Sequence, residues 1–132
     1  MTLDSSALVA VVFSEPGYLE LVDRMLEADV LRVGAPTLAE VSIVLAGRLG
    51  RKTGKADDRL VQDLAKELDI TIVPFGEAEW RRAASAFLRF GRGRHKASLN
   101  FGDCLAYAAA TTAGDALLFV GDDFRHTDVR VA

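Results

Sequence analysis

The chain has 132 residues, of which 50% are apolar and 27% charged, and its net charge is −3. These values predict one soluble globular domain over residues 1–132, and they exclude a disordered chain and a generic polycationic nucleic-acid coat. The single cysteine, Cys104, excludes an internal disulfide framework and fits a reducing compartment. Residues after Met1 form no secretory leader, and no apolar run reaches the length of a membrane span, so we expect a cytoplasmic protein.

Hydrophobic spacing and breaker residues predict strands that alternate with helices. In chain order we expect a strand over 1–4, a helix from Ser5 or Ser6 to about Phe13, a helix over 18–28, a strand over 30–33, a helix over 37–49, a helix around 60–68, a strand over 70–73, helices over 77–90 and 102–113, a strand over 117–120 and a last edge strand over 129–131. The helix over 102–113 is apolar nearly all round, so we expect it at the centre. Because such alternation implies parallel pairing, the fold class is α/β, a three-layer α/β/α sandwich around a central, mainly parallel sheet.

Carboxylates at four places in the chain lie beside predicted apolar elements. Asp4 follows the first strand, Glu40 lies about one turn into an apolar helix, and Asp103 lies in the first turn of its helix. The fourth is Asp122 or Asp123, after the strand over 117–120. An unpaired carboxylate beside a core costs several kcal/mol or loses its charge, and open parallel sheets bind ligands beyond the carboxyl ends of their strands. We therefore expect these acids to meet in one site.

A hard divalent cation is the expected counter-charge, because no matching Lys or Arg stands beside these acids. All-oxygen ligands favour Mg²⁺ or Mn²⁺ over zinc, and the two histidines, His95 and His126, lack metal-ligand spacing. Such a site can activate water and stabilise the leaving oxygen in an in-line attack on phosphorus. Each acid alone also fits a plainer role as a helix cap, a surface residue or a turn residue, and only their joint pattern favours a site.

Four segments of the chain carry motifs that occur together in one known family. They are Leu3-Asp4-Ser5-Ser6-Ala7-Leu8, Ala39-Glu40-Val41, the stretch Gly93–Cys104, and Phe119–Phe124 with Thr127-Asp128. In their order and spacing, over essentially the whole chain, they resemble the PIN-domain ribonuclease toxins of the VapC type, from bacterial toxin–antitoxin pairs. The resemblance implies a PIN fold, RNA cleavage that depends on Mg²⁺ or Mn²⁺, and inhibition by a cognate antitoxin. It also implies a homodimer with an antitoxin segment laid across the site.

The same resemblance assigns roles to individual acids. It places metal ligands at Asp4 and Asp103, and Glu40 as a third carboxylate that orients metal or water. The fourth acid is Asp122 or Asp123, and the sequence leaves this choice open. Ser6 matches a small hydroxyl residue that hydrogen-bonds near the metal. The expected reaction is hydrolysis of an RNA phosphodiester that leaves a 5′-phosphate and a 3′-hydroxyl.

Basic residues gather in two stretches, for which solvated surface loops are one interpretation. The first holds Arg89, Arg92, Arg94, His95 and Lys96, and the second holds Arg48, Arg51, Lys52 and Lys55. Because the first leads directly into Asp103, we expect its residues to bind the RNA backbone in a salt-dependent manner, and Asn100 to hydrogen-bond the substrate.

Other function classes fit the chain less well. A phospho-acceptor receiver needs an acid pair near the first strand and a Lys after the last, but serines follow Asp4 and no Lys follows Lys96. A haloacid-dehalogenase-type phosphatase needs an acid two residues after its first Asp, where this chain has Ser6. The remaining alternative is a non-catalytic PIN module that binds RNA or a partner, and the intact acid set argues against it.

Overall fold

The computed structural model describes residues 1–50 and 59–132, so the predicted basic residues Arg51, Lys52 and Lys55 lie outside the described residues. The described elements are β1 (Thr2–Leu3), α1 (Ser5–Val12), α2 (Tyr18–Leu26), β2 (Leu31–Gly34), α3 (Ala35–Leu45), the π-helical turn η1 (Ala46–Gly50), α5 (Arg59–Glu67), β3 (Ile70–Val73), α6 (Glu77–Phe90), α7 (Phe101–Ala113), β4 (Leu117–Leu118) and the 3-10 turn η2 (Asp123–His126). Most predicted ends agree within about two residues, the usual uncertainty of helix boundaries.

The four strands form one parallel sheet in the order β3-β2-β1-β4, which confirms the predicted fold class. β1 lies between β2 and β4, with Thr2 opposite both Arg32 and Leu117. The β1 strand is only two residues long, but Thr2 and Leu3 are both buried. The carboxyl end of this inner strand is therefore fixed from both sides, and Asp4 follows it directly.

The end of the chain differs from the prediction. β4 stops at Leu118, two residues early, because the Val120 N–H donates to Ser6 Oγ at 3.0 Å instead of to a neighbouring strand. No edge strand forms over residues 129–131. Val131 makes only an isolated bridge to Leu117, while Val129 packs into the core.

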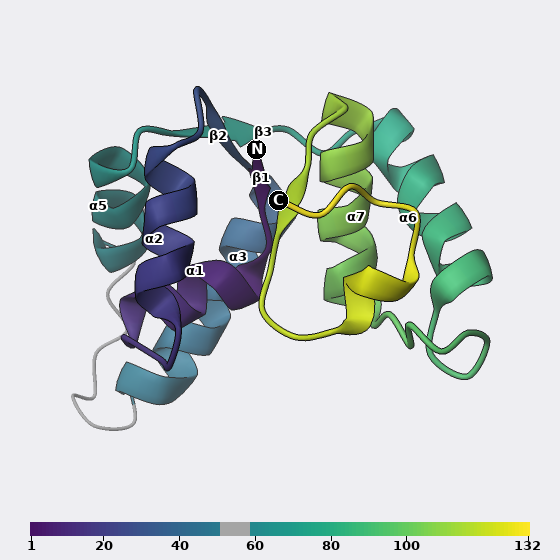
Figure 1. The fold of residues 1–132 in the computed structure, drawn as a ribbon, viewed down its shortest axis with the longest axis horizontal. Coiled ribbons are helices and arrows are strands. Elements are labelled where there is room, and N and C mark those ends of the chain that lie inside the picture. The colour runs from purple at the N-terminus through teal and green to yellow at the C-terminus, as the bar shows by residue number, and fades with distance from the viewer. Residues whose placement is uncertain (51–58) are drawn as a thin grey trace.

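Helices cover the sheet on both faces, and each face has its own apolar core (Figure 1). One core joins α1, α2, α3 and α5 to the sheet around Leu8, Val33 and Val41. The other joins α6 and α7 to β4 and the C-terminal segment around Ala106, Leu117 and Phe124. No helix among residues 1–50 and 59–132 is long and apolar enough to cross a membrane.

Helix α7 occupies the centre of the second core, as its apolar sequence predicts. Ala106, Ala108 and Ala110 are fully buried in it. A Cβ atom at Gly34 would lie 3.4 Å from the Ala109 Cβ, so small residues on both elements allow α7 to pack closely on β2. This close packing brings the N-terminus of α7 next to the carboxyl ends of the strands.

Candidate active site

Asp4 is the most deeply placed acid of the predicted site. Its side chain is 3% exposed and caps α1, with Oδ2 accepting the Ser6 N–H at 3.0 Å and the Ser6 hydroxyl at 2.5 Å. The other oxygen, Oδ1, is buried and has no hydrogen-bond partner within the described part of the chain. Burial raises the pKa of Asp4, although the Ser6 hydroxyl and the backbone N–H groups oppose the shift.

Glu40 extends from α3 toward the first turn of α7. A Cβ atom built on Gly102 would lie 2.6 Å and 2.7 Å from the two Glu40 carboxylate oxygens, so this carboxylate lies directly over the glycine. Burial raises the pKa of Glu40, and the charge of Asp4 adds to the shift, while a hydrogen bond from Ser5 opposes it. Glu40 and Asp4 are therefore electrostatic neighbours, although α1 and α3 carry them separately.

Asp103 forms a reciprocal cap with Asn100 at the start of α7. Asp103 Oδ2 accepts the Asn100 N–H at 2.7 Å, and Asn100 Oδ1 accepts the Asp103 N–H at 3.0 Å. Burial, followed by repulsion from Asp4, Asp123 and Glu40, raises the pKa of Asp103 to about 6. An N-terminal helix acid normally has a lowered pKa, so the neighbouring negative charges and burial outweigh the cap and the helix dipole here.

The two candidates for the fourth acid are placed differently. Asp123 is exposed at the start of η2, yet its charge raises the pKa values of both Asp4 and Asp103. Asp122 is also exposed and faces Arg125, at 3.4 Å between Oδ1 and Nε. The expectation that no arginine stands beside these acids is thus wrong for Asp122. Its charge is not among those that shift the pKa of Asp4, Glu40 or Asp103.

The acids fit a hard divalent cation, although they do not form a complete cage. Among the described residues, no three His, Cys, Asp or Glu side chains stand at metal-ligand spacing. Mg²⁺ is commonly held by one or two carboxylates and keeps several waters, so a full protein cage is not required. Within the described residues Asp4 Oδ1 has no hydrogen-bond partner, and the pKa values of Asp4, Glu40 and Asp103 are all raised, so a divalent cation would favour the ionised forms of these three acids.

The basic loop before α7 is ordered by its own backbone. Leu99 N–H donates to Phe90 O at 3.0 Å and Arg92 N–H donates to Leu99 O at 2.9 Å, which closes the loop at its base. Buried Ala97 and Leu99 anchor it, while Arg92, Arg94 and Lys96 are exposed. The guanidinium of Arg94 lies over the Phe87 ring, 5.6 Å from its centroid. The loop thus presents three cations to solvent in the segment directly before α7.

Three predicted substrate contacts have partners inside the protein. His95 Nδ1 accepts the Ala97 N–H at 3.2 Å, which leaves Nε2 as its available donor. The Oδ1 atom of Asn100 is used in the cap of α7. Ser6 hydrogen-bonds Asp4 and the Val120 N–H, so its hydroxyl joins the acid cluster to the segment after β4.

Arg89 is also tied to the fold rather than presented with the loop. Its Nη2 donates to Asp128 Oδ2 at 2.6 Å, and the Tyr107 hydroxyl donates to Asp128 Oδ1 at 2.6 Å. The Tyr107 hydroxyl holds the pKa of Asp128 below its usual value, and burial raises the pKa of Tyr107 to about 12. This network fastens the C-terminal segment to α6 and α7.

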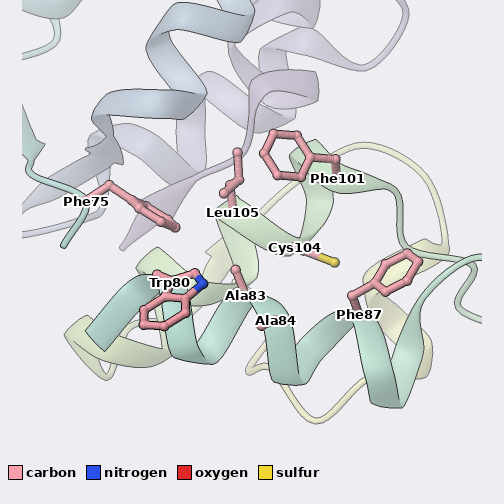
Figure 2. Close-up of a pocket in the computed structure, with 8 residues that line it drawn as sticks. All are labelled: Phe75, Trp80, Ala83, Ala84, Phe87, Phe101, Cys104 and Leu105. Carbon is pink, nitrogen blue, oxygen red and sulfur yellow. The ribbon is translucent and has the colours of Figure 1, made fainter. Parts of the chain in front are cut away.

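An apolar groove between α6 and α7 was not predicted as a feature of its own. Figure 2 shows it between α6 and the first turns of α7, and its volume is about 480 Å³. Its lining residues are Phe75, Trp80, Ala83, Ala84, Phe87, Phe101, Cys104 and Leu105. Trp80 is 57% exposed and Phe101 78%. The helical spacing of Trp80, Ala83, Ala84 and Phe87 is the sequence signal for this face, but it does not distinguish an open groove from a core.

Comparisons with known proteins identify the family of the chain. The PIN domain family model matches residues 1–130. Ribonuclease VapC30 of Mycobacterium tuberculosis (strain H37Rv) is 38% identical over 130 residues, which cover 98% of this chain and 95% of that protein.

Two solved structures share the fold at low identity. VapC20 of Mycobacterium tuberculosis, a toxin that cleaves the sarcin–ricin loop, has a TM-score of 0.75 and 13% identity, covering 99% of this chain and 97% of that one. A toxin–antitoxin complex from Klebsiella pneumoniae has a TM-score of 0.70 and 16% identity, with coverage of 99% and 95%. The chain therefore belongs to the PIN-domain family and, within it, to the VapC ribonucleases.

Proposed function

We propose that this protein is the toxin of a type II toxin–antitoxin system, a cytoplasmic, metal-dependent ribonuclease that a cognate antitoxin inhibits. One observation carries the proposal. Within residues 1–50 and 59–132, one oxygen of the buried Asp4 carboxylate has no hydrogen-bond partner, and the charges of Asp4, Glu40, Asp103 and Asp123 act on one another. Such a cluster is unfavourable in a purely structural role, because burial and mutual repulsion both oppose ionisation.

Asp4 and Asp103 would hold the cation, which we propose to be Mg²⁺ or Mn²⁺. This choice follows the all-oxygen character of the four acids and what membership of the PIN-domain ribonucleases implies. A bound cation would supply the Lewis acidity that activates water and stabilises charge on the phosphate oxygens. Ser6 and Asn100 would orient the two proposed metal ligands. The Ser6 hydroxyl donates to Asp4 Oδ2, and the Asn100 N–H donates to Asp103 Oδ2.

Glu40 and Asp123 complete the proposed site from two other elements. Glu40 lies over the first turn of α7 and orients the attacking water, and Asp123 supplies the fourth carboxylate from η2. We assign the fourth position to Asp123 because only its charge acts on both proposed ligands. The expected products are a 5′-phosphate and a 3′-hydroxyl.

The loop before α7 provides the proposed contacts to the RNA backbone. Arg92, Arg94 and Lys96 are exposed there, and each phosphate contact makes the affinity fall with added salt. The Nε2–H of His95 and the side-chain amide of Asn100 remain as donors to the substrate. Arg89 is excluded from this set by its ion pair with Asp128.

Two protein partners belong to the proposal, a cognate antitoxin and a second copy of the chain. We assign the second copy to the groove between α6 and α7, because the groove is lined by apolar side chains of which Trp80 and Phe101 are 57% and 78% exposed. A two-fold axis through this face would bring the same groove of both copies together and bury these rings.

The proposed activity is tested with protein purified free of antitoxin and incubated with RNA and Mg²⁺. Cleavage should require the cation and should disappear in Asp4→Asn, which retains the helix cap but not the charge. Contaminating nucleases make this variant an essential control. Cleavage that survives in EDTA, or in Asp4→Asn, would overturn the metal mechanism.

A further inference from the structure

The Glu40 carboxylate occupies the space that a side chain at position 102 would need. A Cβ atom on Gly102 would come within 2.6 Å of Oε1, 2.7 Å of Oε2 and 2.9 Å of Cδ of Glu40. Contacts below about 3 Å are essentially never made by real Cβ atoms. Any residue larger than glycine would therefore force the carboxylate away from the start of α7.

Backbone conformation does not explain this glycine. Among the residues that the structure describes, the glycines with left-handed backbone are Gly17, Gly93, Gly114 and Gly121, so Gly102 has a backbone that alanine can adopt. Gly102 lies in the first turn of α7, and glycine within a helix costs about 0.5–1 kcal/mol relative to alanine. An alanine here should thus leave the helix intact or more stable. The absence of a side chain at position 102 instead leaves room for the Glu40 carboxylate.

We infer that Gly102 is a positioning residue of the proposed nuclease. Because it has no side chain, the Glu40 carboxylate can lie against the first turn of α7 and take its place in the acid cluster. The role rests on the proposed function, since it acts through an acid assigned to that site. The clashing atoms belong to the far end of a flexible side chain, so alanine displaces the carboxylate without disrupting the fold. The backbone N–H groups at the start of α7 favour the negative charge that approaches them there.

The test compares Gly102→Ala with Glu40→Gln and with the double variant. Gly47→Ala is the matched control, because Gly47 is also helical and a Cβ atom there would meet nothing within 4 Å. Three measurements are made on each: the crystal structure of the metal-free protein, Mn²⁺ affinity by calorimetry, and RNA cleavage. Thermal unfolding of each variant checks that it is folded.

We expect the Glu40 carboxylate of Gly102→Ala to move off the start of α7, and Mn²⁺ affinity to fall on the order of tenfold. Cleavage should fall by about 100-fold, the size of loss that a small misplacement of a reacting group can cause. In the Glu40→Gln background, Gly102→Ala should change Mn²⁺ affinity by no more than about twofold, because the residue through which it acts has lost its charge.

Three results would overturn the inference: an unmoved carboxylate, an equal loss of affinity in both backgrounds, or the same loss in Gly47→Ala. If the wild-type protein neither binds Mn²⁺ nor cleaves RNA, the proposed function fails instead. The position of Glu40 in the metal-free Gly102→Ala structure still decides the role of the glycine in that case.

Discussion

The hydroxyl of Ser6 donates to Oδ2 of Asp4 across 2.5 Å and, from its other side, accepts the Val120 N–H. One side chain thus fixes the deepest acid and the segment that leads to Asp123. Ser6→Ala should lower cleavage by on the order of tenfold and lower the free energy of unfolding by about 1 kcal/mol. Steady-state cleavage and urea unfolding measure the two effects.

Ser42→Ala is the control for this prediction. Ser42 Oγ donates to Leu38 O within α3, so the variant loses one hydrogen bond without touching an acid. Its stability should fall by no more than that of Ser6→Ala, and its cleavage should be unchanged. Equal cleavage by Ser6→Ala and the wild type would show that Asp4 is held well enough without the hydroxyl.

Asp122 and Asp123 should respond differently to the same substitution. Asp123→Asn should lower cleavage by at least on the order of tenfold, because its charge acts on Asp4 and Asp103. Asp122→Asn loses only an exposed pairing with Arg125, which contributes little, so its rate should stay close to the wild-type rate. Single-turnover cleavage of one RNA by both variants makes the comparison, and the reverse order of rates would move the fourth position to Asp122.

The free energy of unfolding of the metal-free protein should fall as pH rises from about 4 to about 6. The pKa of Asp103 is raised to about 6 in the folded chain, against about 3.9 in an unfolded one. In this window the folded state holds a proton that the unfolded state has released, so stability is lost with rising pH. Asp103→Asn should reduce the slope, to which the raised pKa values of Asp4 and Glu40 also contribute. It should stabilise the protein above pH 6 by ~1 kcal/mol, a gain limited by solvent screening of a partly buried group.

Urea unfolding in EDTA over this pH range tests the slope, with Asp128→Asn as the contrast. The Tyr107 hydroxyl keeps the pKa of Asp128 below its usual value, so the stability from Asp128 is present above about pH 4 and is lost as pH falls further. Its removal should leave the slope at higher pH unchanged. A slope that is undiminished in Asp103→Asn would assign the pH dependence to other groups, first to Asp4 and Glu40.

Trp80→Glu should convert the proposed dimer into a monomer. The side chain lines the groove between α6 and α7 and is largely exposed, so the isolated chain should still fold. A charge at the centre of an apolar contact is left desolvated and unpaired on association. Light scattering after size exclusion should give twice the chain mass for the wild type and for Leu26→Glu, an exposed position on α2, but the mass of one chain for Trp80→Glu. A monomeric wild type, or a dimeric Trp80→Glu, would exclude this face as the contact.

Patterns of neighbouring residues are enough to predict most helices and strands and the places of two site acids. The strand end at Asp4 and the capping position of Asp103 follow from a few neighbouring residues, and the structure places both as expected. The choice between Asp122 and Asp123 depends on the path after β4, where Gly121 turns the chain with a φ of 106°. Because Asp122 and Asp123 are identical neighbours, the sequence around them does not indicate which one the chain turns toward the site.

Long-range contacts account for the other differences. Arg89 belongs to a basic stretch in the sequence, but its partner Asp128 lies 39 positions away. The contact between Glu40 and Gly102 joins two helices, and neither segment alone indicates it. The β4 strand ends early because Ser6, far earlier in the chain, accepts the Val120 N–H.

Because β1 is an inner strand, the acids of the cluster differ in the free energy needed to expose them to solvent. The Asp4 N–H donates to Leu118 O beside a strand that is paired on both sides, so its exchange with solvent deuterium requires the sheet to come apart. Asp123 lies on a four-residue turn, which can open locally while the sheet remains intact. Asp4 is therefore expected to become exposed only when the whole sheet opens, whereas Asp123 can become exposed when its turn alone opens.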